Sequence, residues 1–184
     1  MPYSIHEHKH RFAAWAASTA ASVKGCRFKV KQGKKILEGA NLHDSVKELS
    51  DLPDPDEFDK WHKSMTKTIR EEASKHNDKH GQPLSFSYGV AAKLLNMYLK
   101  SIFVCTENHN HEKVKAIHPP IDNPLLDKLT EIDFHKSKSL WGSARNKGWS
   151  KLSETEYMCL IRCIREGLGG KGLWEIEEFW RGYQ

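Results

Sequence analysis

The segment from Ser85 to Cys105, SFSYGVAAKLLNMYLKSIFVC, constrains the fold of this chain more than any other part of its sequence. Apolar side chains wrap almost the whole circumference of a helix built over these residues. A helix that is apolar nearly all round normally lies at the centre of a domain, where neighbouring helices cover it. We therefore predict a central helix over about 85–105, with the rest of the chain packed around it.

Helical periodicity dominates the rest of the chain as well, and the alternation of apolar and polar residues that marks strands is almost absent. The chain has 184 residues, which matches one domain of ordinary size. That length is sufficient to bury a core without disulfides or metal ions. We therefore predict an all-α fold, with a single helical domain over 1–184.

The N-terminal part of the chain is predicted to form a helix over about 5–23. Its sequence is rich in alanine (AAWAASTAAS), which would let a neighbouring helix backbone approach closely. Phe12, Trp15 and Ala16 follow the three- and four-residue spacing of one helix face. We expect these three side chains to form the buried stripe of this helix.

Composition limits the environments that suit this chain. The N-terminus, MPYSIHEHKHRF, lacks the apolar stretch of a secretory signal, and no apolar run approaches the ~18 residues that suggest a membrane span. The four cysteines form no CxxC pair, so we expect reduced thiols in a cytoplasmic protein with no cofactor and no membrane contact. The net charge of +5 is compatible with DNA or acidic ligands as partners, without identifying either.

Lys93 lies within the apolar central segment, and burial there would change its chemistry. Burial disfavours the charged form of lysine and lowers its pKa, and a neutral amine is a nucleophile that can form Schiff bases. Asp122 follows two prolines, which fix the backbone, and it precedes a predicted helix. A carboxylate held in this way can steer protons or stabilise developing positive charge. Lys93 and Asp122 are therefore the candidate catalytic residues.

The segments around these two residues, Tyr88-Gly-Val-Ala-Ala-Lys-Leu-Leu-Asn96 and His118-Pro-Pro-Ile-Asp-Asn-Pro-Leu-Leu126, resemble the core of helix-hairpin-helix DNA base-excision glycosylases. The resemblance covers roughly 84–129. In that family a glycine-containing hairpin leads into a helix with a catalytic lysine, and an aspartate at the next helix completes the site. The resemblance implies that Lys93 is the nucleophile and that Asp122 manages the proton. The hairpin of this chain has one glycine where the family motif has two.

The stretch 141–151 is basic and carries two tryptophans, and we expect it to form a loop. Interleaved cations and tryptophans can contact phosphates and stack on bases. Alternatively, the tryptophans anchor the core and the cations form its polar rim. The candidate nucleic-acid-binding residues are Lys100, Arg145, Lys147 and Trp149.

Two other groups of residues suggest different chemistry. Arg70 and His76 have a spacing similar to that of HEPN-type ribonucleases, although a helix C-terminus also favours cations. Histidines can bind metal ions, but zinc needs about four ligands in tetrahedral geometry, and paired spacing is absent here. We therefore expect no metal site. The possible ligands in this second group are His6, His8, His10, Cys105, His109, His111 and His118.

Two classes of function remain open. In the first, the chain is a DNA-binding protein of the glycosylase type. In the second, it is a non-catalytic helical module that binds a partner protein or self-associates. Lys93, Asn96 and Lys100 would then form a solvated stripe, and Asp122 would only cap a helix.

Overall fold

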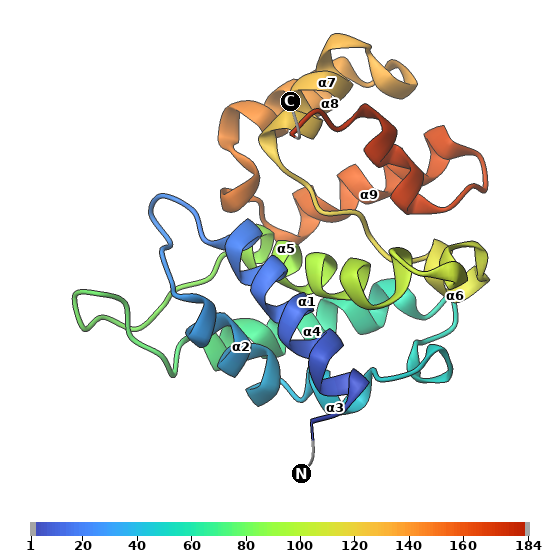
Figure 1. Ribbon diagram of the computed structural model, residues 1–184. Helices are drawn as coiled ribbons and strands as arrows, with labels where there is room; N and C mark the ends of the chain where they lie inside the picture. Colours follow the sequence, from blue (N-terminus) through green and yellow to red (C-terminus); the bar gives the residue numbers. More distant parts are fainter. Residues whose placement is uncertain (1–2, 183–184) are drawn as a thin grey trace.

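Helix α5, Tyr88–Leu99, runs through the middle of the computed structural model, which describes residues 3–182 (Figure 1). Every residue of α5 except Met97 is buried. The side chain of Ser87 caps its first turn, and the helix continues directly into a π-helical turn, η2, Lys100–Val104. The predicted central apolar helix is confirmed. No strand occurs between residues 3 and 182, so the all-α fold is confirmed as well.

Further helices complete the described part of the chain. None of them, nor α5, combines the length and the apolar composition that crossing a bilayer requires. In chain order they are α1 (Ile5–Ala21), α2 (Val30–Gly39), α3 (Leu42–Ser45), η1 (Leu49–Asp51), α4 (Phe58–Ala73), η3 (Glu107–Asn110), α6 (Glu112–Lys115), α7 (Asn123–Glu131), η4 (Phe134–Lys136), α8 (Lys138–Lys147), η5 (Trp149–Lys151), α9 (Glu154–Leu168) and η6 (Leu173–Phe179).

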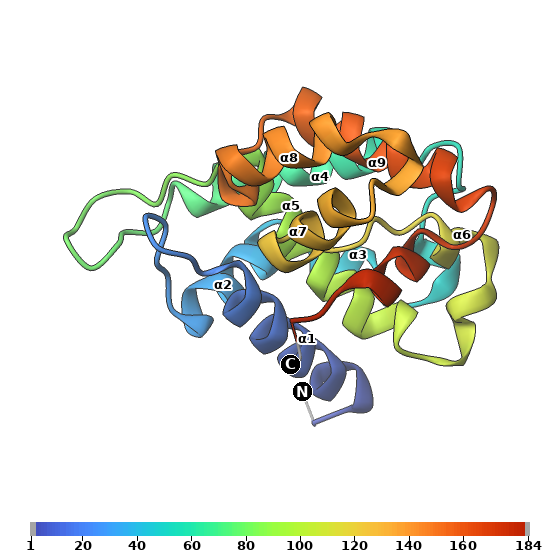
Figure 2. The same ribbon diagram turned by 90° about the horizontal axis from the view of Figure 1, so that it is seen from above.

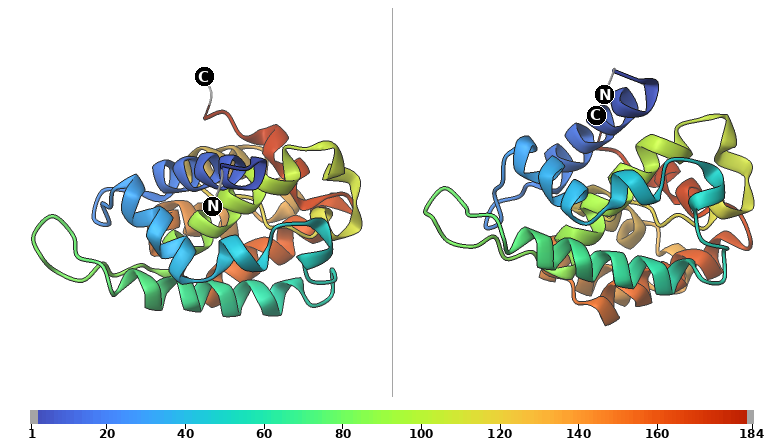
Figure 3. Two further views of the ribbon diagram at one scale, coloured as in Figure 1. Left: turned by 60° about the horizontal axis from the view of Figure 1, so that its bottom comes forward. Right: turned by 90° about the horizontal axis from the view of Figure 1, so that it is seen from below.

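These helices form two groups with α5 between them. Helices α1 to α4 lie on one side of α5, and α7 to α9 lie on the other (Figure 1). Figure 2 shows the last described segment, η6, returning toward the central helix, where Lys100 of η2 pairs with Glu177. Helices α4 and α5 lie side by side, and the connection between them, 74–87, projects from one end of the molecule (Figure 3). Both groups of helices therefore meet on α5.

Helix α1 packs against α5 through small side chains. The predicted stripe is wrong, because Phe12 and Trp15 are 57% and 52% exposed. A buried face of small residues lets the two helix backbones approach closely, and the large aromatic side chains are left on the opposite, solvent-facing side. The small buried residues of α1 are Ala13, Ala14, Ala17, Ser18 and Ala21.

The stretch 141–151 is helical, which corrects the predicted loop. Most of it belongs to α8, and its end forms the short helix η5. Trp141 is fully buried, and its indole N–H donates a hydrogen bond of 2.9 Å to the Phe134 carbonyl. Gly148, with φ +89°, separates the two helices. The basic and glycine-rich composition of this stretch suggested a loop, although one face of α8 is buried.

Candidate functional site

Lys93 lies in the middle of α5, where this helix meets segments from the C-terminal half of the chain. Its side chain is 8% exposed, and its amine nitrogen lies 3.1 Å from Oδ2 of Asp122. The ring of Trp149 packs against the same nitrogen, with 4.4 Å between Nζ and the ring centroid. The fold thus brings together the two candidate catalytic residues, which lie 29 positions apart in the sequence.

Asp122 is held by its backbone and by several hydrogen bonds. It is the N-cap of α7, and the two preceding prolines restrict the approach of the chain. Its Oδ1 accepts a hydrogen bond of 3.1 Å from the backbone N–H of Leu125. Its Oδ2 accepts from Lys93 and, at 3.0 Å, from the indole N–H of Trp180. A carboxylate with three donors around it is fixed in one orientation.

Burial and the neighbouring acid act on Lys93 in opposite directions. Burial is the larger influence and lowers the pKa of the Lys93 ammonium, while the charge and hydrogen bond of Asp122 raise it. Such an environment brings the amine closer to its neutral, nucleophilic form at a given pH. Neither Lys93 nor Asn96, which is fully buried, belongs to a solvated stripe.

A second buried ion pair lies next to the first. Lys100 of η2 donates a hydrogen bond to Glu177 of η6, and both side chains are largely sheltered from solvent. Burial raises the pKa of Glu177, and the charge of Lys100 opposes that shift. Each lysine is matched by an acid, so the surroundings of Lys93 carry no net positive rim.

The C-terminal segment closes this region. Trp180 reaches Asp122, and Glu177 reaches Lys100, so both ion pairs are tied to residues 173–180. Five hollows along the surface of residues 3–182 are lined by other side chains, and neither Lys93 nor Asp122 borders any of the five. Trp180 and Glu177 therefore cover the two ion pairs on the side of the C-terminal segment.

The candidate nucleic-acid-binding residues of the C-terminal half lie near acids. Arg145 of α8 pairs with Asp127 at 2.5 Å, and Lys147 pairs with Glu156 at 2.6 Å. Trp149 is buried and covers the amine of Lys93, so its ring face is already in use. The fold therefore brings Trp149 to Lys93, but it does not assemble these residues into an uncompensated basic surface.

A chain of buried polar side chains, which the sequence pattern did not reveal, lies between α4, α5 and α9. The imidazole Nε2–H of His118 donates to Asp59 at 2.9 Å, and its Nδ1 accepts from the Tyr157 hydroxyl at 3.3 Å. The same hydroxyl accepts a hydrogen bond of 2.7 Å from the amide of Asn96. Arg165 makes two hydrogen bonds to Asp59, at 2.7 and 3.1 Å, and is the last side chain at this end of the hydrogen-bonded series.

The other end of the buried chain continues from the amide of Asn96. Its oxygen accepts a hydrogen bond of 2.9 Å from Nε2 of His62, and its nitrogen also donates to the Pro119 carbonyl at 3.0 Å. Nδ1 of His62 lies 3.3 Å from the Tyr88 hydroxyl. Nε2 of His62 carries a proton, and burial lowers the pKa of this imidazole, which favours its neutral form.

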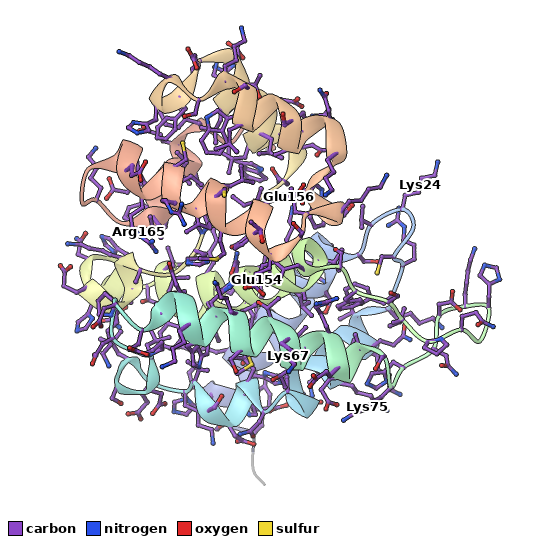
Figure 4. The ribbon with its side chains drawn as sticks, turned by 180° about the vertical axis from the view of Figure 1, so that it is seen from behind. Lys24, Lys67, Lys75, Glu154, Glu156 and Arg165 are labelled. Atoms are coloured by element: carbon purple, nitrogen blue, oxygen red, sulfur yellow. The ribbon has the colours of Figure 1, made fainter. Side chains whose placement is uncertain are left out.

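The electrostatics of the buried chain agree with this pattern. Burial lowers the pKa of both His62 and His118 below the usual value. Burial acts to raise the pKa of Asp59, but hydrogen bonds from His118 and Arg165 outweigh it and hold that pKa well below its usual range. Figure 4 shows Arg165 on α9, at the edge of the fold. Hydrogen bonds among these buried groups compensate for their removal from water and so stabilise the fold.

Sequence signals for the buried chain were present but weak. His62 lies on the apolar face of α4, and His118 directly precedes two prolines.

Among residues 3–182, no three histidine, cysteine or acidic side chains come together as a metal site requires. Arg70 donates a hydrogen bond of 3.0 Å to the Phe86 carbonyl, so part of its guanidinium holds the 74–87 connection in place.

No family model, no curated protein and no solved structure matches this chain.

Proposed function

We propose that this chain is a DNA-binding protein of the helix-hairpin-helix base-excision glycosylase type, in which Lys93 is the nucleophile and Asp122 manages the proton. The observation that carries the proposal is the distance of 3.1 Å between the Lys93 amine and the Asp122 carboxylate, inside a largely buried site. The position of Asp122 at a helix start after two prolines supports the same assignment. Gly89 does not, because it lies buried within α5 and its backbone N–H donates to the Leu152 carbonyl at 3.2 Å, so it forms no hairpin open to DNA.

The chemistry follows from the state of the amine. Asp122 accepts a proton from the Lys93 ammonium, and the neutral amine attacks C1′ of a damaged nucleotide. The bond between C1′ and the base breaks, and the base leaves with the electron pair of that bond and takes up a proton. The amine then remains joined to C1′, and opening of the sugar ring gives an imine. Borohydride reduces this imine to a stable amine, which makes the intermediate measurable.

Access to the amine is the main physical requirement of this function. A base flipped out of a duplex needs a pocket beside Lys93. Trp180 and Glu177 cover that position, so segment 173–182 must move away when DNA binds. This segment also buries Leu173 and Ile176 in the core, so the movement must be limited to its end around Glu177 and Trp180.

The test is borohydride trapping on a panel of duplexes that contain an abasic site, a uracil, an oxidised purine or an alkylated purine. The proposal predicts a covalent protein–DNA adduct on at least one lesion, and its loss in Lys93→Ala. Lys128→Ala is the matched control, because it removes a lysine of the adjoining helix α7 that pairs with Glu131 rather than Asp122. Absence of an adduct on every lesion, or an unchanged adduct in Lys93→Ala, would refute the catalytic assignment.

A second candidate function is a non-catalytic module that binds a protein or a second copy of itself. The observation that favours it is the aromatic pair Phe12 and Trp15, whose rings lie 5.8 Å apart on the exposed face of α1. Tyr3 and Ile5, both 62% exposed, extend the apolar surface at the start of the helix. Light scattering tests self-association: a concentration-dependent dimer that Phe12→Ser/Trp15→Ser converts to a monomer supports it, and a monomer at every concentration refutes it.

A further inference from the structure

A group of exposed cations lies away from Lys93, at the end of the molecule where the 74–87 connection projects. A hollow of about 620 Å³ opens there between the segment 27–35 and the segment 76–79. Five of its lining residues carry a full positive charge, and Asp78 is the only acid among them. The five cations are Arg27, Lys29, Lys31, Lys35 and Lys79. We call this set the basic hollow.

The cations of the basic hollow lack an acidic partner in the described part of the chain, unlike Lys93, Lys100 and many other cations. Within residues 3–182, none of the five forms a salt bridge, and all five are exposed. Lys24, at the tip of the adjoining loop, is also exposed and forms no salt bridge within this range, and it is labelled in Figure 4. Lys34 and Lys75, which flank the hollow, pair with Glu38 and Glu72. Five cations without an acidic partner therefore line one hollow.

Both walls of the basic hollow are fixed by hydrogen bonds. The side-chain amide of Gln32 donates to the Asn77 carbonyl at 2.7 Å, and its oxygen accepts from the backbone N–H of Lys29 at 2.8 Å. Gln32 therefore joins the start of α2 to the 76–79 wall. The carboxylate of Asp78 accepts from the backbone N–H groups of His80 and Gln82, so it is engaged by its own loop. The hollow thus exists before any ligand arrives.

We propose that the basic hollow binds the phosphate backbone of DNA. Five unpaired cations spread over two walls suit several phosphates along a strand better than a single anion. No large apolar side chain is exposed among the lining residues, which disfavours insertion into a lipid surface. The contacts carry no base information, so the binding is independent of sequence.

The position of the hollow connects it with Lys93. The 76–79 wall continues along the chain through residues 83–87 into the first turn of α5, which carries Lys93. DNA held at this end would be anchored beside the start of the catalytic helix. This inference deepens the proposed function and rests on it for the choice of DNA, because it names the surface that holds the duplex while the amine acts.

The test measures binding of a fluorescent duplex by anisotropy between about 50 and 200 mM salt. Arg27→Gln/Lys31→Gln/Lys35→Gln removes three charges of the basic hollow. Lys136→Gln/Lys138→Gln/Arg162→Gln removes three exposed charges of the C-terminal half that likewise form no salt bridge within residues 3–182, and it is the matched control. We expect the hollow variant to bind at least about tenfold more weakly, and its salt slope to fall by about one for each phosphate that it no longer neutralises. The control should stay within about twofold of the natural chain.

Three outcomes separate the hollow from the catalytic proposal. Equal binding and an equal salt slope in the hollow variant and the natural chain would overturn the hollow. So would binding of anionic phosphatidylserine vesicles, but not of DNA, that is abolished in the same variant. DNA binding that depends on the hollow without trapping on any lesion would leave the hollow intact and refute the catalytic role of Lys93. Unchanged circular dichroism and thermal midpoints would establish that both triple variants are folded.

Discussion

Two polar regions meet on the same helix and satisfy their polar groups in different ways. Through Asn96, α5 joins a buried chain of neutral imidazole, phenol and amide groups. Through Lys93 and Lys100, α5 and the turn that continues it join two ion pairs that are closed by the C-terminal segment. The first region lies in the interior and is tied to three other parts of the core. The second lies just beneath a segment of about ten residues.

The difference lies in what covers each region. In the buried chain of polar side chains, every group that Asn96 contacts is buried. Removal of the Asn96 amide would leave donors and acceptors in the core without hydrogen-bond partners. In the ion-pair region, the amine is covered by the ring of Trp149 and by the C-terminal segment through Trp180 and Glu177. Burial lowers the pKa of Lys93 in this region, and our proposal requires that the end of the segment can move to admit a ligand.

The largest effect is expected from breaking the neutral chain. Asn96→Leu leaves His62, Tyr157 and the Pro119 carbonyl without this partner, which should lower the free energy of unfolding by about 3–5 kcal/mol. Urea unfolding measures this loss. Met97→Leu, at the one residue of α5 that is not fully buried, should change the stability by less than about 1 kcal/mol. Equal effects of the two substitutions would contradict the structural role of Asn96.

The next effect is a loss of stability in acid that comes from the same region. His62 and His118 have folded-state pKa values below the ordinary 6.5, so the unfolded chain takes up protons first as the pH falls. Stability should therefore decrease below about pH 6.5, by up to about 1.4 kcal/mol per pH unit for each imidazole. Asp59 adds a further loss below its unfolded value of 3.8, because its folded pKa is depressed. His118→Gln should reduce the slope between pH 6.5 and 5, and an unchanged slope would be the contrary result.

Replacing the lysine should separate stability from reactivity. Lys93→Met keeps the approximate length of the side chain and leaves Asp122 with its hydrogen bonds from Leu125 and Trp180. Removing one partner of a fully buried ion pair costs about 3–5 kcal/mol, but Asp122 is partly exposed and keeps two donors. We therefore expect a decrease of about 1–3 kcal/mol in the free energy of unfolding by urea, smaller than that of Asn96→Leu, together with complete absence of the trapped adduct. A decrease above about 3 kcal/mol would mean that the ion pair is part of the structural core.

The smallest expected effect concerns the closing segment. Trp180→Phe keeps an aromatic ring and removes the N–H that donates to Asp122. The adduct should form about two- to tenfold faster, because the segment is then held closed by one hydrogen bond fewer, a change of about 0.5–1.5 kcal/mol. The rate of borohydride trapping at fixed pH measures it. A slower reaction would show that Trp180 takes part in binding the substrate.

The sequence predicted the helices where pattern and burial agree. The apolar run over α5 predicted that this helix lies at the centre of the fold. The prolines before Asp122 indicated that a helix begins just after this residue. Prediction failed at Phe12 and Trp15, because size suggested burial whereas close packing of α1 against α5 required alanine. It failed again at 141–151, where glycines and cations masked the buried side of α8.

The candidate site was predictable in part. Lys93 and Asp122 stood out by chemistry, and their contact depended on the path of the chain between them, which no local pattern specifies. The neutral chain was not predictable, since His62, His118 and Tyr157 come from three separate segments. The basic hollow was not predictable for the same reason, because its cations come from two separate segments. The hydrogen bond from Gln32 to Asn77 joins these segments across about 45 positions of sequence.

The most direct test of the catalytic role of Lys93 is to locate the bond in a trapped complex. A borohydride-reduced adduct with abasic-site DNA would be digested with protease and nuclease, and the peptide that carries the nucleotide would be identified by mass spectrometry. We expect a single attachment at Lys93, with a yield that rises with pH and reaches half its maximum below 10.5, because burial lowers the pKa of that amine. Attachment at Lys100, at the N-terminal amine or at scattered surface lysines would contradict this role.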